Sequence, residues 1–298
     1  MMKRNRIITR RDFLRGTVYT AFATSMGLSP PVKREAKAEE KVKVILVRDE
    51  KVIDPQGHIN PEIVQKMLDQ GVSSLMGEEN PLQAWKKLIR PTDVVGIKSN
   101  VWNPLPTPKE LETAIEKRVL EMGVPKESIS IDDRGVLNNK VFLSSTALIN
   151  AHPLRIHHWS GIGGCIKNYI MFVDDPPFYH PDSCADLGAI WNLPIVKGKT
   201  RLNVLLVLTP QFYGRGPHNY DPRHIWTYGG MLVSRDPVAV DALGAELLRL
   251  KRIELFGEDK PVTPTKHVEY AETRHGIGVA DLKRIDLVKL GWQERLML

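Results

Sequence analysis

Cysteine is scarce in this chain of 298 residues, which contains only Cys165 and Cys184. Two thiols cannot supply the four ligands of a typical iron–sulfur cluster, and the sequence has no Cys-x-x-Cys pair of the kind that binds structural zinc. We therefore expect no iron–sulfur cluster. Free or structural cysteines are favoured over a metal role, and in an oxidising compartment the two could also pair as a disulfide.

Long apolar runs are also absent. The apolar stretch near the start, residues 16–28, is about 13 residues long, whereas a transmembrane helix needs roughly 20. No other segment is long and apolar enough to span a membrane. The sequence therefore predicts no stable membrane span once its first residues have been removed.

A charge imbalance is missing from most of the chain. The formal net charge is +7, but residues 1–38 contain nine Lys or Arg and only two acidic residues. Residues 39–298 contain 33 basic and 33 acidic side chains. The electrostatic argument for a nucleic-acid partner disappears with the first segment, so we expect none.

That first segment has the order of an export signal. Residues 9–15 read TRRDFLR, which matches the twin-arginine consensus; the uncharged stretch follows, and Ala36-Lys37-Ala38 supplies small residues for cleavage before Glu39. The alternative is a basic tail with a chance Arg-Arg pair. We predict a signal peptide over residues 1–38, the twin-arginine translocase as partner, and a periplasmic or otherwise extracytoplasmic protein exported in folded form.

The remaining residues, 39–298, alternate between strand and helix patterns. Apolar runs predict strands at 41–48, 93–98, 129–132, 202–208 and 230–234, and helical spacing predicts helices at 61–68, 82–88, 107–122 and 236–250. Segment 146–157 is ambiguous, 174–200 is expected to be a surface excursion, and 254–298 a loop-rich tail. The pattern predicts a single α/β domain with a mostly parallel or mixed sheet and helices on both faces.

The first candidate site is the glycine-rich segment 157–168, HHWSGIGGCIKN. Backbone N–H groups at a glycine turn that opens a helix can bind an anion. We predict that Gly161, Gly163, Gly164 and Asn168 bind one, that Lys167 adds positive charge, and that His157 acts as acid, base or metal ligand. The alternative is a structural turn with a solvated histidine and lysine.

Two further histidines offer a metal site. His180 and His218 lie in expected loops, and together with His157 they could bind a transition metal. Single loop histidines are more often solvated. The sequence does not decide whether the three converge, and a transition-metal cofactor stays open.

Acidic residues at element ends form the third candidate. Asp236 before Pro237 is a helix cap by pattern. Asp241 follows among small apolar residues, so it lies either on the solvent face or buried and paired, and we assign it a catalytic role with His157 and Lys167. Asp132 and Asp133, at a strand end, are candidates for orienting partners.

These segments together resemble the family catalogued as domain of unknown function 362, over residues of about 41–250. The resemblance rests on Lys98-Ser99-Asn100, the strand-end acids, Arg155-x-His157, Lys167-Asn168, the helix start 107–111, Gly216-Pro217 and, most specifically, the segment 234–241. It implies an α/β fold and little about activity. Some relatives carry ferredoxin-like cysteine clusters, which this sequence lacks. Arg155 stands where the family pattern has lysine.

Two main functions remain open on this basis. One is an exported enzyme acting on a small anionic substrate, with or without a bound metal. The other is a non-catalytic periplasmic accessory protein that binds a ligand or metal, with a purely structural subunit as a third reading. Convergence of His157, Lys167 and the strand-end acids on one cavity favours the enzyme.

Overall fold

The computed structural model describes residues 41–216 and 220–298. Lys41–Leu298 forms a single compact unit. The predicted signal peptide lies outside the described residues. Within the described part, no helix has both the length and the apolar character needed to cross a bilayer.

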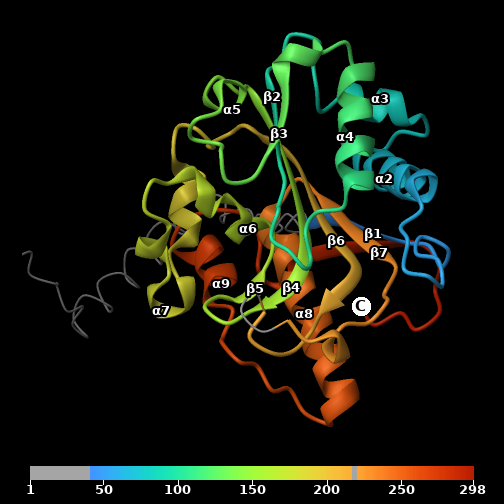
Figure 1. The fold of residues 1–298 in the computed structure, drawn as a ribbon, viewed down its shortest axis with the longest axis vertical. Helices are drawn as coiled ribbons and strands as arrows, with labels where there is room; N and C mark the ends of the chain where they lie inside the picture. Colours follow the sequence, from blue (N-terminus) through green and yellow to red (C-terminus); the bar gives the residue numbers. More distant parts are fainter. Residues whose placement is uncertain (1–40, 217–219) are drawn as a thin grey trace, which may run out of the picture. The chain divides into compact units, whose positions relative to one another are not determined.

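A mixed sheet of eight strands runs through the described residues (Figure 1). Seven follow the order β3-β2-β4-β6-β7-β1-β8, and β5 pairs only with β4. Neighbours from β3 to β6 are parallel, whereas β7 is antiparallel to both β6 and β1. The strands are β1 Val42–Arg48, β2 Val95–Lys98, β3 Ile129–Asp132, β4 Ala147–His157, β5 Gly161–Gly163, β6 Thr200–Gln211, β7 Gly230–Ser234 and β8 Ile285–Gly291. The predicted α/β fold is confirmed.

Helices cover both faces of the sheet (Figure 1). One face carries α2 (Pro61–Met76), α3 (Pro81–Lys86) and α4 (Lys109–Glu121), and the other carries α6 (Cys165–Asn168), α8 (Pro237–Phe256) and α9 (Lys266–Thr273). Alternate residues of β1 divide between the two cores: Ile45 and Val47 pack beneath α2, and Val44 and Leu46 on the opposite side. This alternation is the two-residue period of a strand buried on both faces.

The capping pattern decides where the helices begin. Asp236 accepts hydrogen bonds from the Val238 and Ala239 amides, as predicted for the start of α8. Thr107 precedes Pro108 in the pattern expected of a helix cap, but it does not cap α4. The cap residue is Pro108, and the Thr107 hydroxyl instead bonds the Asn100 amide and the Ala151 carbonyl.

The ambiguous segment 146–157 contains the central strand β4, Ala147–His157, in which every residue is buried. Its two buried faces remove the polar–apolar alternation that identifies an ordinary strand. Pro153 sits beside a register shift between β4 and β6, where a missing N–H interrupts no regular ladder.

Two loop predictions are wrong in part. Segment 174–200 forms short helical turns, including α7 (Pro181–Cys184), and buries Cys184, Leu187 and Trp191 in the core. The tail beyond residue 254 adds α9 and β8, and β8 pairs in parallel with β1 at the edge of the sheet. Both segments gain their order from burial against distant parts of the chain.

Candidate functional site

A cavity of about 320 Å³ lies where the parallel strands β2, β3 and β4 end. Asn100 follows β2, and Asp133 follows β3. Arg155 and His157 lie at the carboxyl end of β4. Gly163 on β5 and Lys167 on α6 close another side. Carboxyl ends of parallel strands are the usual ligand edge of an α/β sheet. The structure thus brings His157, Lys167 and Asp133 to one cavity.

At the base of this cavity, buried polar side chains are hydrogen-bonded to one another. The Lys98 ammonium forms an ion pair with Asp133 and also donates to the Ser99 carbonyl (2.8 Å) and the Asn168 Oδ1 (3.2 Å). Asn168 in turn donates to the Asn150 Oδ1 at 2.8 Å. The side chain of Asn168, predicted to bind an anion, is therefore already engaged with the strand ends, and Asp133 is neutralised by Lys98.

Lys167 has no comparable partner. Its side chain is only 8 % exposed, and the described residues offer its ammonium no hydrogen bond or ion pair. Loss of hydration, together with the nearby charge of Arg155, lowers the pKa of Lys167 to about 8. A buried ammonium without a counterion is costly, so such a group is a strong indication of a binding site.

Arg155 supplies a second buried cation. Its guanidinium donates to the Asn100 Oδ1 (3.2 Å) and lies 4.8 Å from the centre of the Trp102 ring. The Arg155 Nε has no hydrogen-bond partner, and neither has the Nδ1 of His152, which lines the same cavity. Burial lowers the pKa of Arg155 to about 9, which still leaves it charged at neutral pH. No pattern in the sequence had marked Arg155, His152 or Trp102 as a site residue.

His157 is held as a neutral imidazole. Burial is the main cause that moves its pKa far below the ordinary value, and the charges of Lys167 and Arg155 act in the same direction. The His157 Nδ1 accepts a hydrogen bond from the Trp159 amide at 3.2 Å. The proton of the neutral ring is therefore assigned to Nε2, so His157 is a hydrogen-bond donor through that nitrogen.

Asp241 occupies the amides that we expected to be open to a ligand. Its two carboxylate oxygens accept from the Cys165 N–H (2.7 Å) and the Ile166 N–H (2.8 Å), and the side chain is fully buried. A Cβ at Gly164 would lie 2.4 Å from the Asp241 Oδ1, so glycine is required for this approach. The expectation of bare amides is wrong because the chain caps them itself, and Asp241 does not line the cavity.

The remaining predicted residues divide between the cavity and other places. Gly163 lines the cavity, whereas Gly161 packs against the segment 263–265. The Asp132 carboxylate accepts from the Gly135 amide at 3.0 Å and orders a loop outside the cavity.

Two of the three histidines in the predicted metal site are described by the structure. His180 lies with its ring centre 4.2 Å from that of Trp159, and burial lowers its pKa to about 4. His218 lies outside the described residues, so the set of His157, His180 and His218 stays a prediction. Across residues 41–216 and 220–298, no group of three His, Cys, Asp or Glu side chains is placed to hold a metal. Cys165 and Cys184 are both buried and free.

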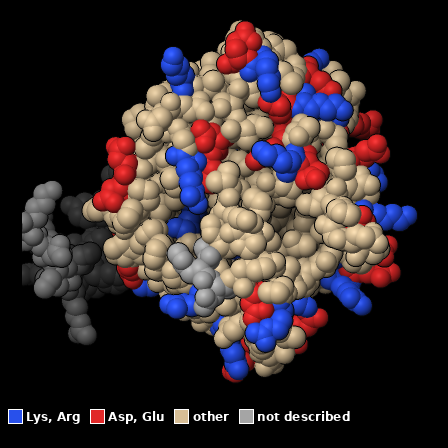
Figure 2. Space-filling view, in the orientation of Figure 1, with Lys and Arg blue, Asp and Glu red and all other residues tan. Residues whose placement is uncertain are grey.

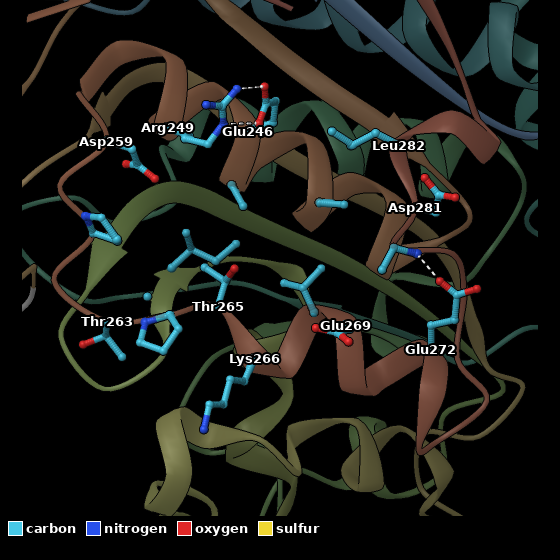
Figure 3. Close-up of a pocket in the computed structure, with 18 of the residues that line it drawn as sticks. Glu246, Arg249, Asp259, Thr263, Thr265, Lys266, Glu269, Glu272, Asp281 and Leu282 are labelled. Carbon is cyan, nitrogen blue, oxygen red and sulfur yellow. Dashed lines mark hydrogen bonds and ion pairs between the residues drawn. The ribbon is translucent and has the colours of Figure 1, made fainter. Parts of the chain in front are cut away.

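A larger cavity of about 730 Å³ lies beside α8 and α9 (Figure 3). Both of its arginines are paired with acids of the same lining: Arg249 is turned toward Glu246, and Arg252 pairs with Asp259. Its walls include the apolar Ile156 and Ile162. Because its arginines are paired, we assign the candidate site to the smaller cavity.

The face drawn in Figure 2 carries charges of both signs. Lys and Arg side chains alternate there with Asp and Glu around a broad region free of charge. This agrees with the equal numbers of acidic and basic residues in positions 39–298.

One comparison with known proteins gives a match. The model of a family described as Domain of unknown function (DUF362) matches residues 95–246, a range that contains every residue lining the smaller cavity. No curated protein and no solved structure matches the chain.

Proposed function

The chain belongs to the DUF362 family, and from this premise we propose that it is an enzyme acting on a small anionic substrate in the cavity at the ends of β2, β3 and β4. The observation that supports the proposal is the charge of that cavity. Arg155 and Lys167 are both buried in its lining, the Arg155 Nε has no hydrogen-bond partner, and the acid among the lining residues, Asp133, is neutralised by Lys98.

Each group has a role that its surroundings favour. Arg155 binds the anion, because its guanidinium stays charged and is oriented by Asn100 and Trp102. Lys167 contributes a second donor, and the His157 Nε2–H polarises an oxygen of the substrate. Asp241 is a positioning residue that fixes the start of α6 and with it Lys167.

The volume limits the size of the substrate. A space of about 320 Å³ is at the lower end of the range for ligand cavities, so a small metabolite fits better than a polymer. Mixed surface charge makes a nucleic-acid substrate still less fitting.

The test uses protein purified from cells that express the full chain. Small molecules released by denaturing the wild type are compared by mass spectrometry with those from Arg155→Met and from Arg90→Met, an exposed arginine outside the cavity. We expect a released anion that is lost in Arg155→Met and kept in Arg90→Met. Incubation of that anion with the enzyme should then consume it; unchanged anion would instead favour the binding accessory protein.

We also propose export by the twin-arginine route. The support is the order of the TRRDFLR motif, uncharged stretch and small-residue cleavage site in residues 1–38. Replacing Arg10 and Arg11 together by lysine should leave the chain uncleaved in the cytoplasm, as measured by fractionation and immunoblotting. Unchanged processing of the double variant would contradict this route.

A further inference from the structure

Two lysines are buried near the cavity, and they differ in one respect. Lys98 is fully buried but paired with Asp133, whereas Lys167 is 8 % exposed, lines the cavity and has no counterion in the described part of the chain. A lysine that served only the stability of the fold would be paired as Lys98 is, because an isolated buried ammonium is unfavourable. The difference indicates that Lys167 works in its neutral form, as an amine.

We infer that Lys167 is a nucleophile that forms an imine with a 2-oxo carboxylate whose carboxylate is bound by Arg155. This inference rests on the proposed function and names its substrate class. Arg155 requires an anionic group, Lys167 requires an electrophilic carbon, and a 2-oxo carboxylate carries both on adjacent atoms. Lysines with reduced hydration next to another cation are the ones that proteins use as amine nucleophiles.

The surroundings of Lys167 favour its neutral form. Burial and Arg155 lower its pKa to about 8, so about a tenth of Lys167 is free amine at pH 7, far more than for a lysine with the ordinary pKa. The titratable and charged groups whose electrostatic interaction with Lys167 is appreciable come from three parts of the chain. They are His152, Arg155 and His157 on β4, His180 and Cys184 at the two ends of α7, and His267 on α9. The pKa values of the four histidines among them are lowered, so these rings are neutral and provide no counterion.

The bond changes balance without another reactant. The lone pair of Lys167 Nζ attacks the 2-carbon, a C–N bond forms, and the electron pair of the C=O bond moves to the oxygen, which takes the proton leaving Nζ. His157 stabilises this oxygen by donating its Nε2–H as a hydrogen bond. The resulting hydroxyl leaves with one proton from solvent as water, and the product is an iminium ion that the bound carboxylate stabilises by its opposite charge.

The experiment is reductive trapping with pyruvate. Full-length protein is incubated with pyruvate and borohydride, and tryptic peptides are mapped by mass spectrometry. Lactate is the matched probe, because it has the same carboxylate but no carbonyl. We expect an adduct on Lys167 with pyruvate, none with lactate, and none on Lys98. The trapping rate should rise about tenfold per pH unit below the pKa of Lys167 and level off above it.

Two variants separate this inference from the proposed function. Lys167→Arg keeps the positive charge and should lose the adduct while still binding lactate; Lys197→Arg, at an exposed position, should behave as the wild type. Anion binding without any adduct on Lys167 would overturn the imine and leave the proposed function standing. Adducts spread over exposed lysines, or on Lys98, would also overturn it. Absence of binding by pyruvate and lactate alike would count against both. Peptide mapping of the wild type decides the matter even if Lys167→Arg does not fold.

Discussion

Replacing Lys167 by methionine should make the protein more stable while removing its function. Methionine has a similar length and apolar character, so it fills the same space without a charge. Removing a buried charge that has no partner removes its desolvation cost. Residues that serve binding often reduce the stability of the fold, so we expect the loss of such a group to increase it.

The magnitude follows from the pKa of Lys167, which falls from an ordinary 10.5 to about 8 on folding. Below pH 8 the folded and unfolded states both carry the proton, and the full cost, about 3 kcal/mol, is present. Between pH 8 and 10.5 the unfolded chain binds more protons than the folded one, so the stability of the wild type rises with pH. Lys167→Met should therefore be about 3 kcal/mol more stable at pH 7 and nearly equal to the wild type above pH 10.5.

Lys98→Met is the matched control, because it makes the same change at the other buried lysine. It leaves Asp133 buried without its counterion, which typically costs about 3–5 kcal/mol. The assay is urea unfolding followed by circular dichroism at pH 7 and pH 10, with full-length proteins. The reasoning is refuted if Lys167→Met is less stable than the wild type at pH 7, since Lys167 would then have a structural partner.

Two further predictions concern the glycine turn. An asparagine at position 241 can accept from only one of the Cys165 and Ile166 amides, because its NH₂ group faces the other. Asp241→Asn should therefore lower the free energy of unfolding, measured by urea titration, by about 1–3 kcal/mol. A free energy equal to that of the wild type within error would show that the carboxylate is dispensable. Gly163→Ala places a Cβ 3.3 Å from the His152 ring, so the cavity wall must shift slightly. We expect weaker anion binding by calorimetry with a nearly unchanged melting temperature, and equal loss of both would make Gly163 structural.

The parts of the fold that depend on local pattern could be predicted. Strands β3 and β7 coincide with their predicted bounds, and the cap at Asp236 lies where the Asp-Pro pair indicated. β4 could not be assigned, because burial of both its faces removes the alternation on which the assignment depends. β8 was included in the predicted loop-rich tail, because its partner β1 lies more than 240 residues earlier in the chain.

Part of the candidate site could be predicted from the sequence. His157 and Lys167 were chosen for residue type beside a glycine turn, and both line the cavity. Arg155 was noted only for the family resemblance, as part of the Arg155-x-His157 pair and as a departure from the family's lysine, and it was not assigned to the site. Its position two residues before His157 on a strand places both side chains on one face. The two-residue spacing could therefore have identified Arg155 as a site residue. No local sequence pattern could have predicted that Asp241 caps the glycine turn, because the two segments are some 75 residues apart.

The sequence by itself determined the alternation of strands and helices, the segregation of basic residues into positions 1–38 and the chemical types available to a site, because these depend on neighbours along the chain. Only the tertiary structure decided which charges are paired. Lys98 and Lys167 are both lysines near strand ends, but Asp133 reaches one of them and not the other. Pairing and hydration depend on distances in space between distant segments, and those distances separate a lysine that holds the fold together from one available to a ligand.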